Sequence, residues 1–233
     1  MQEQLLFYWE ERFVRYLGSS MDWTDGSHDP GHFQRVWKAA QYINREEGNI
    51  ADPLVLLAAA YFHDLITLPK DHPRRGESSR MSAERAVELL QTYFNGEKEG
   101  IPGFPPGKIE AVRHAIHAHS FSAGITPLTA EAKILQDADR LEAIGAIGLA
   151  RVFYTAGRLD AKLFDPADPL AERREPDDRR YALDHFGVKL LKLPALMNTA
   201  TGRRLADANA GYLLRFLEKI RGEIEGDYSA MTR

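Results

Sequence analysis

Apolar residues recur at helical spacing along most of the chain, and no strand-like alternation extends beyond a few residues. Proline, glycine and hydroxyl-bearing residues mark the ends of the periodic stretches. The pattern therefore predicts an all-α fold of about eight helices. The main predicted helices cover residues 3–17, 30–47, 79–94, 108–120, 181–193 and 202–225, and a further helical stretch follows Thr129.

The most apolar stretch begins at Asp52-Pro53, a cap residue followed by proline at the first helical position. Nine apolar residues follow, so this helix is predicted to be buried on all sides. It leads into His63 and Asp64, and a buried carboxylate needs a cationic partner or a metal ion. Adjacent helical positions lie about 100° apart, so the two side chains can straddle one ion.

Further ligands must come from elsewhere in the chain. His32 falls in the first turn of the helix that begins at Pro30. Asp137 and Asp139 are separated by one residue in a later helix and point to different faces, so only one of them is expected to bind the ion.

The ordered set His32, His63-Asp64 and Asp139 resembles the HD-domain metal-dependent phosphohydrolases, which take ligands from three separate helices in this order. The similarity to the YedJ/YpgQ-type branch of that superfamily extends over roughly residues 31–217. It is clearest in the segments 114–122, 137–148 and 184–193. The resemblance implies that His32, His63, Asp64 and Asp139 are the metal ligands, and it selects Asp139 over Asp137.

Three histidines fall in the predicted helix 108–120. On a helical wheel His114 and His117 lie about 60° apart, whereas His119 lies at least about 140° from both, so a regular helix cannot direct all three to one ion. The family pattern retains His114 and His119, which become the catalytic candidates together with Asp64. For His119 a core histidine bonded to the backbone remains an alternative. A second ion would need His117 as well, so a single ion is favoured.

A loop at residues 67–77 follows the metal pair and is rich in cations. Lysine and arginine beside a metal suit phosphate groups. Lys70 and Arg75 are therefore candidate substrate-binding residues, together with Arg140, and an ordinary solvated charge cluster is the alternative for the loop. His28 is expected to be solvated.

Two other features are interpreted structurally. Gly145 and Gly148 lie in helical, apolar surroundings, which favours close helix packing over a phosphate-binding loop. Asp184-His185 reverses the order of the metal pair and is interpreted as a cap or an internal hydrogen bond rather than a second metal site.

Composition removes several other classes of function. The absence of cysteine excludes disulfides and thiolate zinc sites. A net charge of −4 and a pI near 6.1 give no overall basic surface, so stable nucleic-acid binding is not expected. We expect no signal peptide and no membrane span, and hence a soluble cytoplasmic protein. The oligomeric state stays open.

We expect one HD domain over residues 1–233. Its metal core covers roughly 29–157, an irregular excursion covers 158–180, and closing helices cover 181–226. Two imidazoles and two carboxylates suit Mn²⁺, Fe²⁺, Co²⁺ or Ni²⁺, and suit Mg²⁺ less well. The resemblance favours Mn²⁺ among them.

The resemblance implies a (deoxy)nucleoside triphosphate pyrophosphohydrolase that releases a nucleoside monophosphate and pyrophosphate. The alternatives within catalysis are a nucleotide phosphomonoesterase and a cyclic-nucleotide phosphodiesterase. A sensor that binds metal and nucleotide without turnover belongs to another class, and a purely structural metal site is a further alternative.

Overall fold

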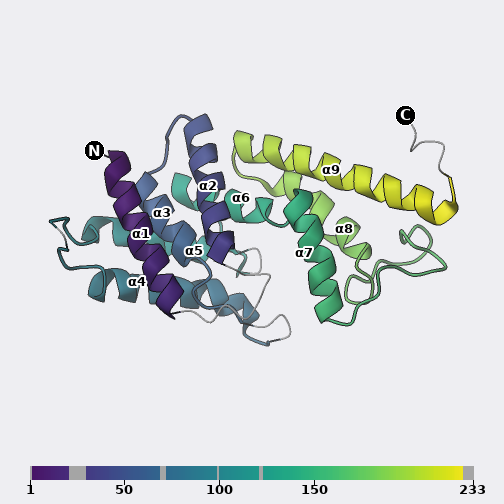
Figure 1. The fold of residues 1–233 in the computed structure, drawn as a ribbon, viewed down its shortest axis with the longest axis horizontal. Coiled ribbons are helices and arrows are strands. Elements are labelled where there is room, and N and C mark those ends of the chain that lie inside the picture. The colour runs from purple at the N-terminus through teal and green to yellow at the C-terminus, as the bar shows by residue number, and fades with distance from the viewer. Residues whose placement is uncertain (1, 21–29, 69–71, 99, 121–122, 228–233) are drawn as a thin grey trace. The chain divides into compact units, whose positions relative to one another are not determined.

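The computed structural model describes residues 2–20, 30–68, 72–98, 100–120 and 123–227 (Figure 1). Within these residues there are nine α-helices and, in place of any sheet, two isolated bridges, so the all-α prediction is confirmed. None of these helices has the length and hydrophobicity needed to cross a membrane. The helices are α1 (Gln2–Ser20), α2 (Pro30–Glu46), α3 (Pro53–Phe62), α4 (Ser78–Thr92), α5 (Ile109–His119), α6 (Ala130–Leu141), α7 (Gly145–Arg158), α8 (Asp184–Val188) and α9 (Ala200–Glu225).

The chain forms two compact units, residues 1–139 and residues 140–233. The expectation of one HD domain over the whole chain stays a prediction. Each unit has its own buried core.

Aromatic side chains form much of the core of the first unit. The ring of Phe13 lies 4.7 Å from that of Phe62 and 5.1 Å from that of Phe94, measured between centroids. Trp9 makes an edge contact with Phe104 at 5.4 Å. Since α1 supplies Trp9 and Phe13 and α3 supplies Phe62, these contacts fix α1 against the buried helix.

The predicted start of α3 is confirmed, but the helix ends before the His63-Asp64 pair, which was expected to occupy adjacent helical positions. The Asp52 side chain accepts hydrogen bonds from the backbone N–H groups of Leu54 and Val55, as an N-cap does. Every residue from Leu54 to Phe62 is buried. The helix ends at Phe62, so His63 is its C-cap and Asp64 lies in the following turn, where Leu65 N–H bonds to the Phe62 carbonyl at 3.4 Å.

Two other predicted boundaries also differ from the structure. Gly18 was expected to end the first helix, but α1 continues to Ser20 because nothing forces Gly18 out of the helical conformation. The predicted helix 181–193 is interrupted at Lys189, whose φ of −130° and ψ of −57° are not helical. α8 precedes this break, and a 3₁₀ helix, η4 (Leu190–Leu196), follows it.

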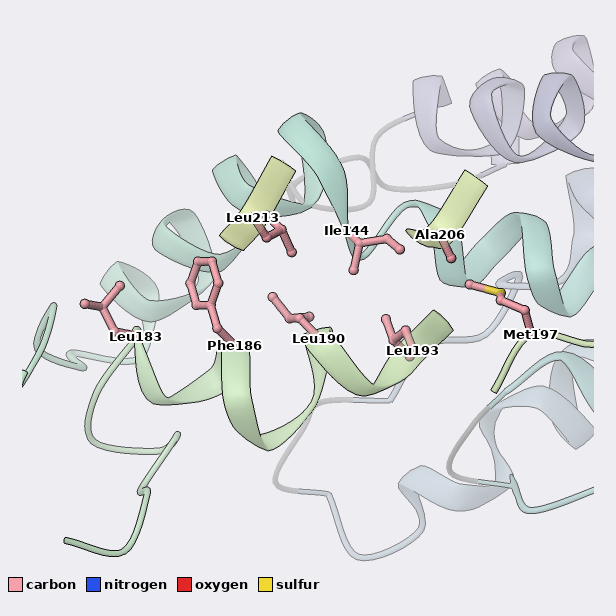
Figure 2. Packing of buried hydrophobic residues seen from close by; sticks show 8 residues of the cluster. All are labelled: Ile144, Leu183, Phe186, Leu190, Leu193, Met197, Ala206 and Leu213. Carbon is pink, nitrogen blue, oxygen red and sulfur yellow. The ribbon is translucent and has the colours of Figure 1, made fainter. Parts of the chain in front are cut away.

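The second unit encloses its own hydrophobic cluster, which Figure 2 shows between α9, η4 and the segment before α7. Phe186 stacks on Phe216 with ring centroids 5.9 Å apart, and Leu213 is fully buried beside them. Gly145 begins α7 with φ +74°, and a Cβ there would lie 2.8 Å from the Asn209 side chain. Close packing thus accounts for Gly145, as the sequence suggested.

A buried ion pair holds the irregular segment before α8. Arg174 donates to both carboxylate oxygens of Asp184 at 2.5 and 2.8 Å, and the Asp177 backbone N–H bonds to the same carboxylate at 2.6 Å. The Asp184 side chain has no solvent exposure. The interpretation of Asp184 as a site of internal hydrogen bonding agrees with these contacts, and His185 likewise pairs with Asp178 at 2.8 Å.

We predict that Asp184→Ala lowers the free energy of unfolding by about 3 kcal/mol, because it leaves a partly buried guanidinium without its carboxylate. Urea denaturation followed by circular dichroism measures the change. Asp178→Ala is the control, since it removes the partly exposed pair with His185 from the same segment and should cost less than about 1 kcal/mol. Equal losses in the two variants would contradict the role given to Asp184.

Candidate metal centre

Two imidazoles from different helices meet in the interior of the first unit. His32 lies in the first turn of α2 and His63 caps the end of α3, and their exposed fractions are 1% and 0%. Their Nε2 atoms lie 3.0 Å apart. Nitrogen atoms this close, in two buried rings, need a proton or a cation between them.

Hydrogen bonding fixes which nitrogen of His63 faces the centre. Its Nδ1–H donates to the Ala60 carbonyl at 2.8 Å, which leaves the Nε2 lone pair directed at His32. Burial lowers the pKa of His63 to about 4, although the nearby Asp64 carboxylate acts in the opposite direction. His63 is therefore neutral at physiological pH, the form that binds metals.

Asp139 completes one group of possible ligands. Its Oδ1 lies 3.6 Å from His32 Nε2 and 3.7 Å from His63 Nε2. These three ligand atoms all lie within 4.8 Å of one another. Burial raises the pKa of the Asp139 carboxyl, but the surrounding histidines outweigh it, and the net shift is downward. Asp139 is thus held as a carboxylate.

Asp64 connects this group to a second one. Its Oδ2 lies 3.7 Å from His63 Nε2, and its Oδ1 lies 3.5 Å from His119 Nε2. Burial acts to raise the pKa of Asp64, and the histidines around it, His63 first, hold it well below its usual range. His63, Asp64 and His119 form the second group whose ligand atoms lie within 4.8 Å.

His119 repeats the geometry of His63. It is the last residue of α5, its Nδ1–H donates to the Ile116 carbonyl at 2.6 Å, and its exposed fraction is 4%. Burial alone would lower the pKa of His119, but the hydrogen bond and charge of Asp64 raise it. One ring nitrogen of His119 therefore bonds the backbone while the other faces Asp64, and the catalytic role expected for His119 stays a prediction.

The other two histidines of α5 belong to neither group among the described residues. His114 Nε2 accepts a hydrogen bond from the Leu128 backbone N–H at 3.0 Å, so it faces the segment before α6. Burial, followed by the charges of Arg113 and Arg80, lowers the pKa of His117. The catalytic role expected for His114 stays a prediction. Of the histidines in α5, His119 is the one that contacts Asp64.

The predicted phosphate-binding residues lie in different settings. Lys70 and His28 are outside the described residues. Arg75 Nη1 donates to the Leu68 carbonyl at 2.6 Å, and Arg140 Nη1 donates to the Leu196 carbonyl. Arg74 donates two hydrogen bonds to the Glu77 carboxylate. Hydrogen bonds from Arg74 and Arg80 lower the pKa of Glu77 to about 2.

Hydroxyl groups that the sequence did not single out support the backbone after Asp64. Ser82 Oγ receives a hydrogen bond from Ile66 N–H at 3.0 Å and donates to the Ile66 carbonyl at 3.1 Å. Ser78 Oγ accepts from Leu68 N–H at 3.2 Å. The turn that presents Asp64 is therefore attached to α4, a role that no local sequence signal reveals.

Polar contacts also join the starts of the helices that carry His63, His119 and Asp139. Asp52, the cap of α3, pairs with Lys108 at the start of α5, and its backbone N–H donates to Glu131 in α6 at 2.9 Å. The ligand-bearing ends of these helices meet as well. The three helices therefore run side by side in the same direction.

An HD domain model matches residues 31–144, a range that includes all five residues of the two groups. Over 220 residues the chain is 32% identical to YpgQ of Bacillus subtilis, described as an uncharacterized protein, with coverage of 93% of this chain and 94% of YpgQ. The chain belongs to the HD-domain family.

Solved structures give the same result for the HD domain's fold. The structure of B. subtilis YpgQ in complex with ADP has a TM-score of 0.68 and 29% identity, covering 96% of this chain and 99% of YpgQ. An HD-superfamily hydrolase from Bacillus thuringiensis matches with a TM-score of 0.68 and 27% identity over 94% of this chain and 97% of its own. The resemblance to the YpgQ-type branch is therefore confirmed.

The donor set of this HD domain fits a divalent metal. His32, His63 and Asp139 form one group, and Asp64 lies beside His63, so the site offers two imidazole nitrogens and two carboxylates. This mixture suits first-row ions such as Mn²⁺, Fe²⁺, Co²⁺ and Ni²⁺, and is less suited to Mg²⁺.

We predict that Asp139→Asn weakens Mn²⁺ binding by at least about 100-fold, since the amide keeps the size of the side chain and removes its charge. Isothermal titration calorimetry of metal-free protein measures the affinity. His117→Gln changes a histidine of α5 outside both groups and should bind Mn²⁺ as the unmodified protein does. Unchanged affinity in Asp139→Asn would remove Asp139 from the ligand set.

Proposed function

We propose that the chain is a metal-dependent phosphohydrolase that splits (deoxy)nucleoside triphosphates into a nucleoside monophosphate and pyrophosphate, with Mn²⁺ as the favoured ion. The observation that carries the proposal is the approach of His32, His63 and Asp139 to one another, with Asp64 beside His63. Membership of a family with hydrolases supports the reaction class. The relative YpgQ with bound ADP supports a nucleotide as the substrate.

His32, His63, Asp64 and Asp139 would hold the ion. When bound, such an ion lowers the pKa of a water molecule and polarises a phosphoryl oxygen. The carboxylate of Asp64 would also orient the attacking water, because one oxygen faces His63 while the other faces His119. Attack of the water oxygen on the α-phosphorus breaks the bond to the bridging oxygen, and pyrophosphate leaves.

The departing pyrophosphate oxygen needs a proton or a cation. His119 is proposed to supply the proton, and the proposal is supported by Asp64, whose hydrogen bond and charge outweigh burial and raise the pKa of His119. Lys70, Arg75 and Arg140 are proposed to neutralise the phosphate charges, and His114 remains a second candidate acid.

The decisive experiment is phosphorus NMR of the protein with dATP and Mn²⁺, quenched by a chelator. Pyrophosphate together with dAMP is the expected result. Orthophosphate together with dADP would place the attack on the terminal phosphorus and refute the proposed bond cleavage. Asp64→Asn is the matched control, because it should abolish turnover while circular dichroism shows that its helices remain. Metal-dependent nucleotide binding without product would indicate a sensor.

We also predict that His119→Gln lowers kcat by about 100-fold, the usual cost of losing a general acid. His114→Gln should change kcat by less than about 3-fold, because His114 faces Leu128 rather than Asp64. Steady-state assays with dATP over a range of pH measure both variants. If the two variants exchange these effects, His114 is the acid.

A further inference from the structure

A single carboxylate on α1 joins the two helices that carry the histidine ligands. Glu10 Oε1 accepts a hydrogen bond from the Tyr61 hydroxyl of α3 at 2.7 Å. Glu10 Oε2 accepts one from Trp37 Nε1 of α2 at 3.2 Å. We call this set of three residues the Glu10 clamp. We propose that Glu10 is a positioning residue of the metal centre, an inference that rests on the proposed function.

Both donors of the Glu10 clamp are buried, with exposed fractions of 1% for Tyr61 and 2% for Trp37. A buried donor that loses its acceptor keeps its full desolvation cost, so both donors favour the arrangement in which Glu10 reaches them together.

The Glu10 clamp acts on the same pair of helices as the imidazole contact. Tyr61 precedes His63 by two residues in α3, and Trp37 follows His32 by about one and a half turns in α2. Sliding α3 along α2 by one residue would move His63 about 1.5 Å relative to His32. The Nε2 atoms lie 3.0 Å apart, so such a movement would spoil their joint approach to one ion.

Polar contacts between α3 and other helices lie toward its two ends, at Asp52 and at Tyr61. Its surface from Leu54 to Phe62 is apolar except for the Tyr61 hydroxyl, and apolar contacts are not directional. A hydrogen bond from Tyr61 therefore adds a directional restraint near the site to the close packing of α3. Glu10 supplies such a bond on the face of α3 away from His63, because positions two residues apart lie about 200° apart.

The test measures metal affinity in folded protein, which a merely stabilising role would not change. We expect Tyr61→Phe and Glu10→Gln each to weaken Mn²⁺ binding by about 3- to 30-fold in calorimetry. The double variant should bind Mn²⁺ no more weakly than the single variant with the lower affinity, because both changes act on the bond between Tyr61 and Glu10. Tyr61→Phe removes only a hydroxyl, so it tests the proposal even if Glu10→Gln fails to fold.

Tyr8→Phe is the matched control, since it removes a hydroxyl of α1 that donates to the Lys98 carbonyl at 2.9 Å and accepts from Arg12 at 3.4 Å. It should leave Mn²⁺ affinity unchanged. Lower unfolding temperatures for the clamp variants with wild-type Mn²⁺ affinity would overturn the proposal, even if the protein hydrolyses nucleotides. If the wild-type protein binds no Mn²⁺, both proposals are overturned. If it binds Mn²⁺ without turnover and the clamp variants bind Mn²⁺ more weakly, the role of the Glu10 clamp is supported and the proposed reaction is not.

Discussion

The contact between His32 and His63 is the constraint on which the first unit depends. Two imidazole nitrogens lie 3.0 Å apart where neither ring meets solvent, and they stay there only if a proton or a cation lies between them. Because burial keeps His63 neutral, the negative charges of Asp64 and Asp139 dominate the centre. The arrangement therefore favours the arrival of a divalent cation over the uptake of further protons.

The ends of two helices orient the side chains of His63 and His119. His63 and His119 both stand where a helix ends, and both use Nδ1–H to bond the carbonyl three residues earlier. Carbonyls in the last turn of a helix lack partners within the helix, so each histidine satisfies one of them while its ring becomes fixed. The same bond leaves Nε2 to face the centre.

Much of the fold and part of the site could be predicted from the sequence, because the signals are local. The cap at Asp52, the burial of α3 and the pairing of His63 with Asp64 all follow from neighbouring residues. Asp139 could be preferred to Asp137 only through the family resemblance. The Asp64–His119 contact was out of reach, because a helical wheel gives angles within one helix and not the place where another helix ends.

Contacts between residues far apart in the sequence were also out of reach. Glu10, Ser78 and Ser82 lie in ordinary polar positions of amphipathic helices, and only the packing of α1 and α4 against the rest reveals what they bind. The break at Lys189 is similar, since the apolar pattern continues through it into η4. A continuous α-helix was expected to bury these apolar side chains. In the second unit the 3₁₀ helix η4 buries them instead.

The backbone after Asp64 shows how support and chemistry are joined in this protein. Ile66 is bonded on both its N–H and its carbonyl by Ser82, and Leu68 is bonded on its N–H by Ser78 and on its carbonyl by Arg75. The backbone from Asp64 is therefore held by hydrogen bonds as far as Leu68. Arg75 bonds the backbone that leads from Asp64, so its removal would disturb the metal pair as well as any phosphate bound beside it. Loss of activity in an Arg75 variant would thus identify a phosphate contact only if metal affinity were unchanged.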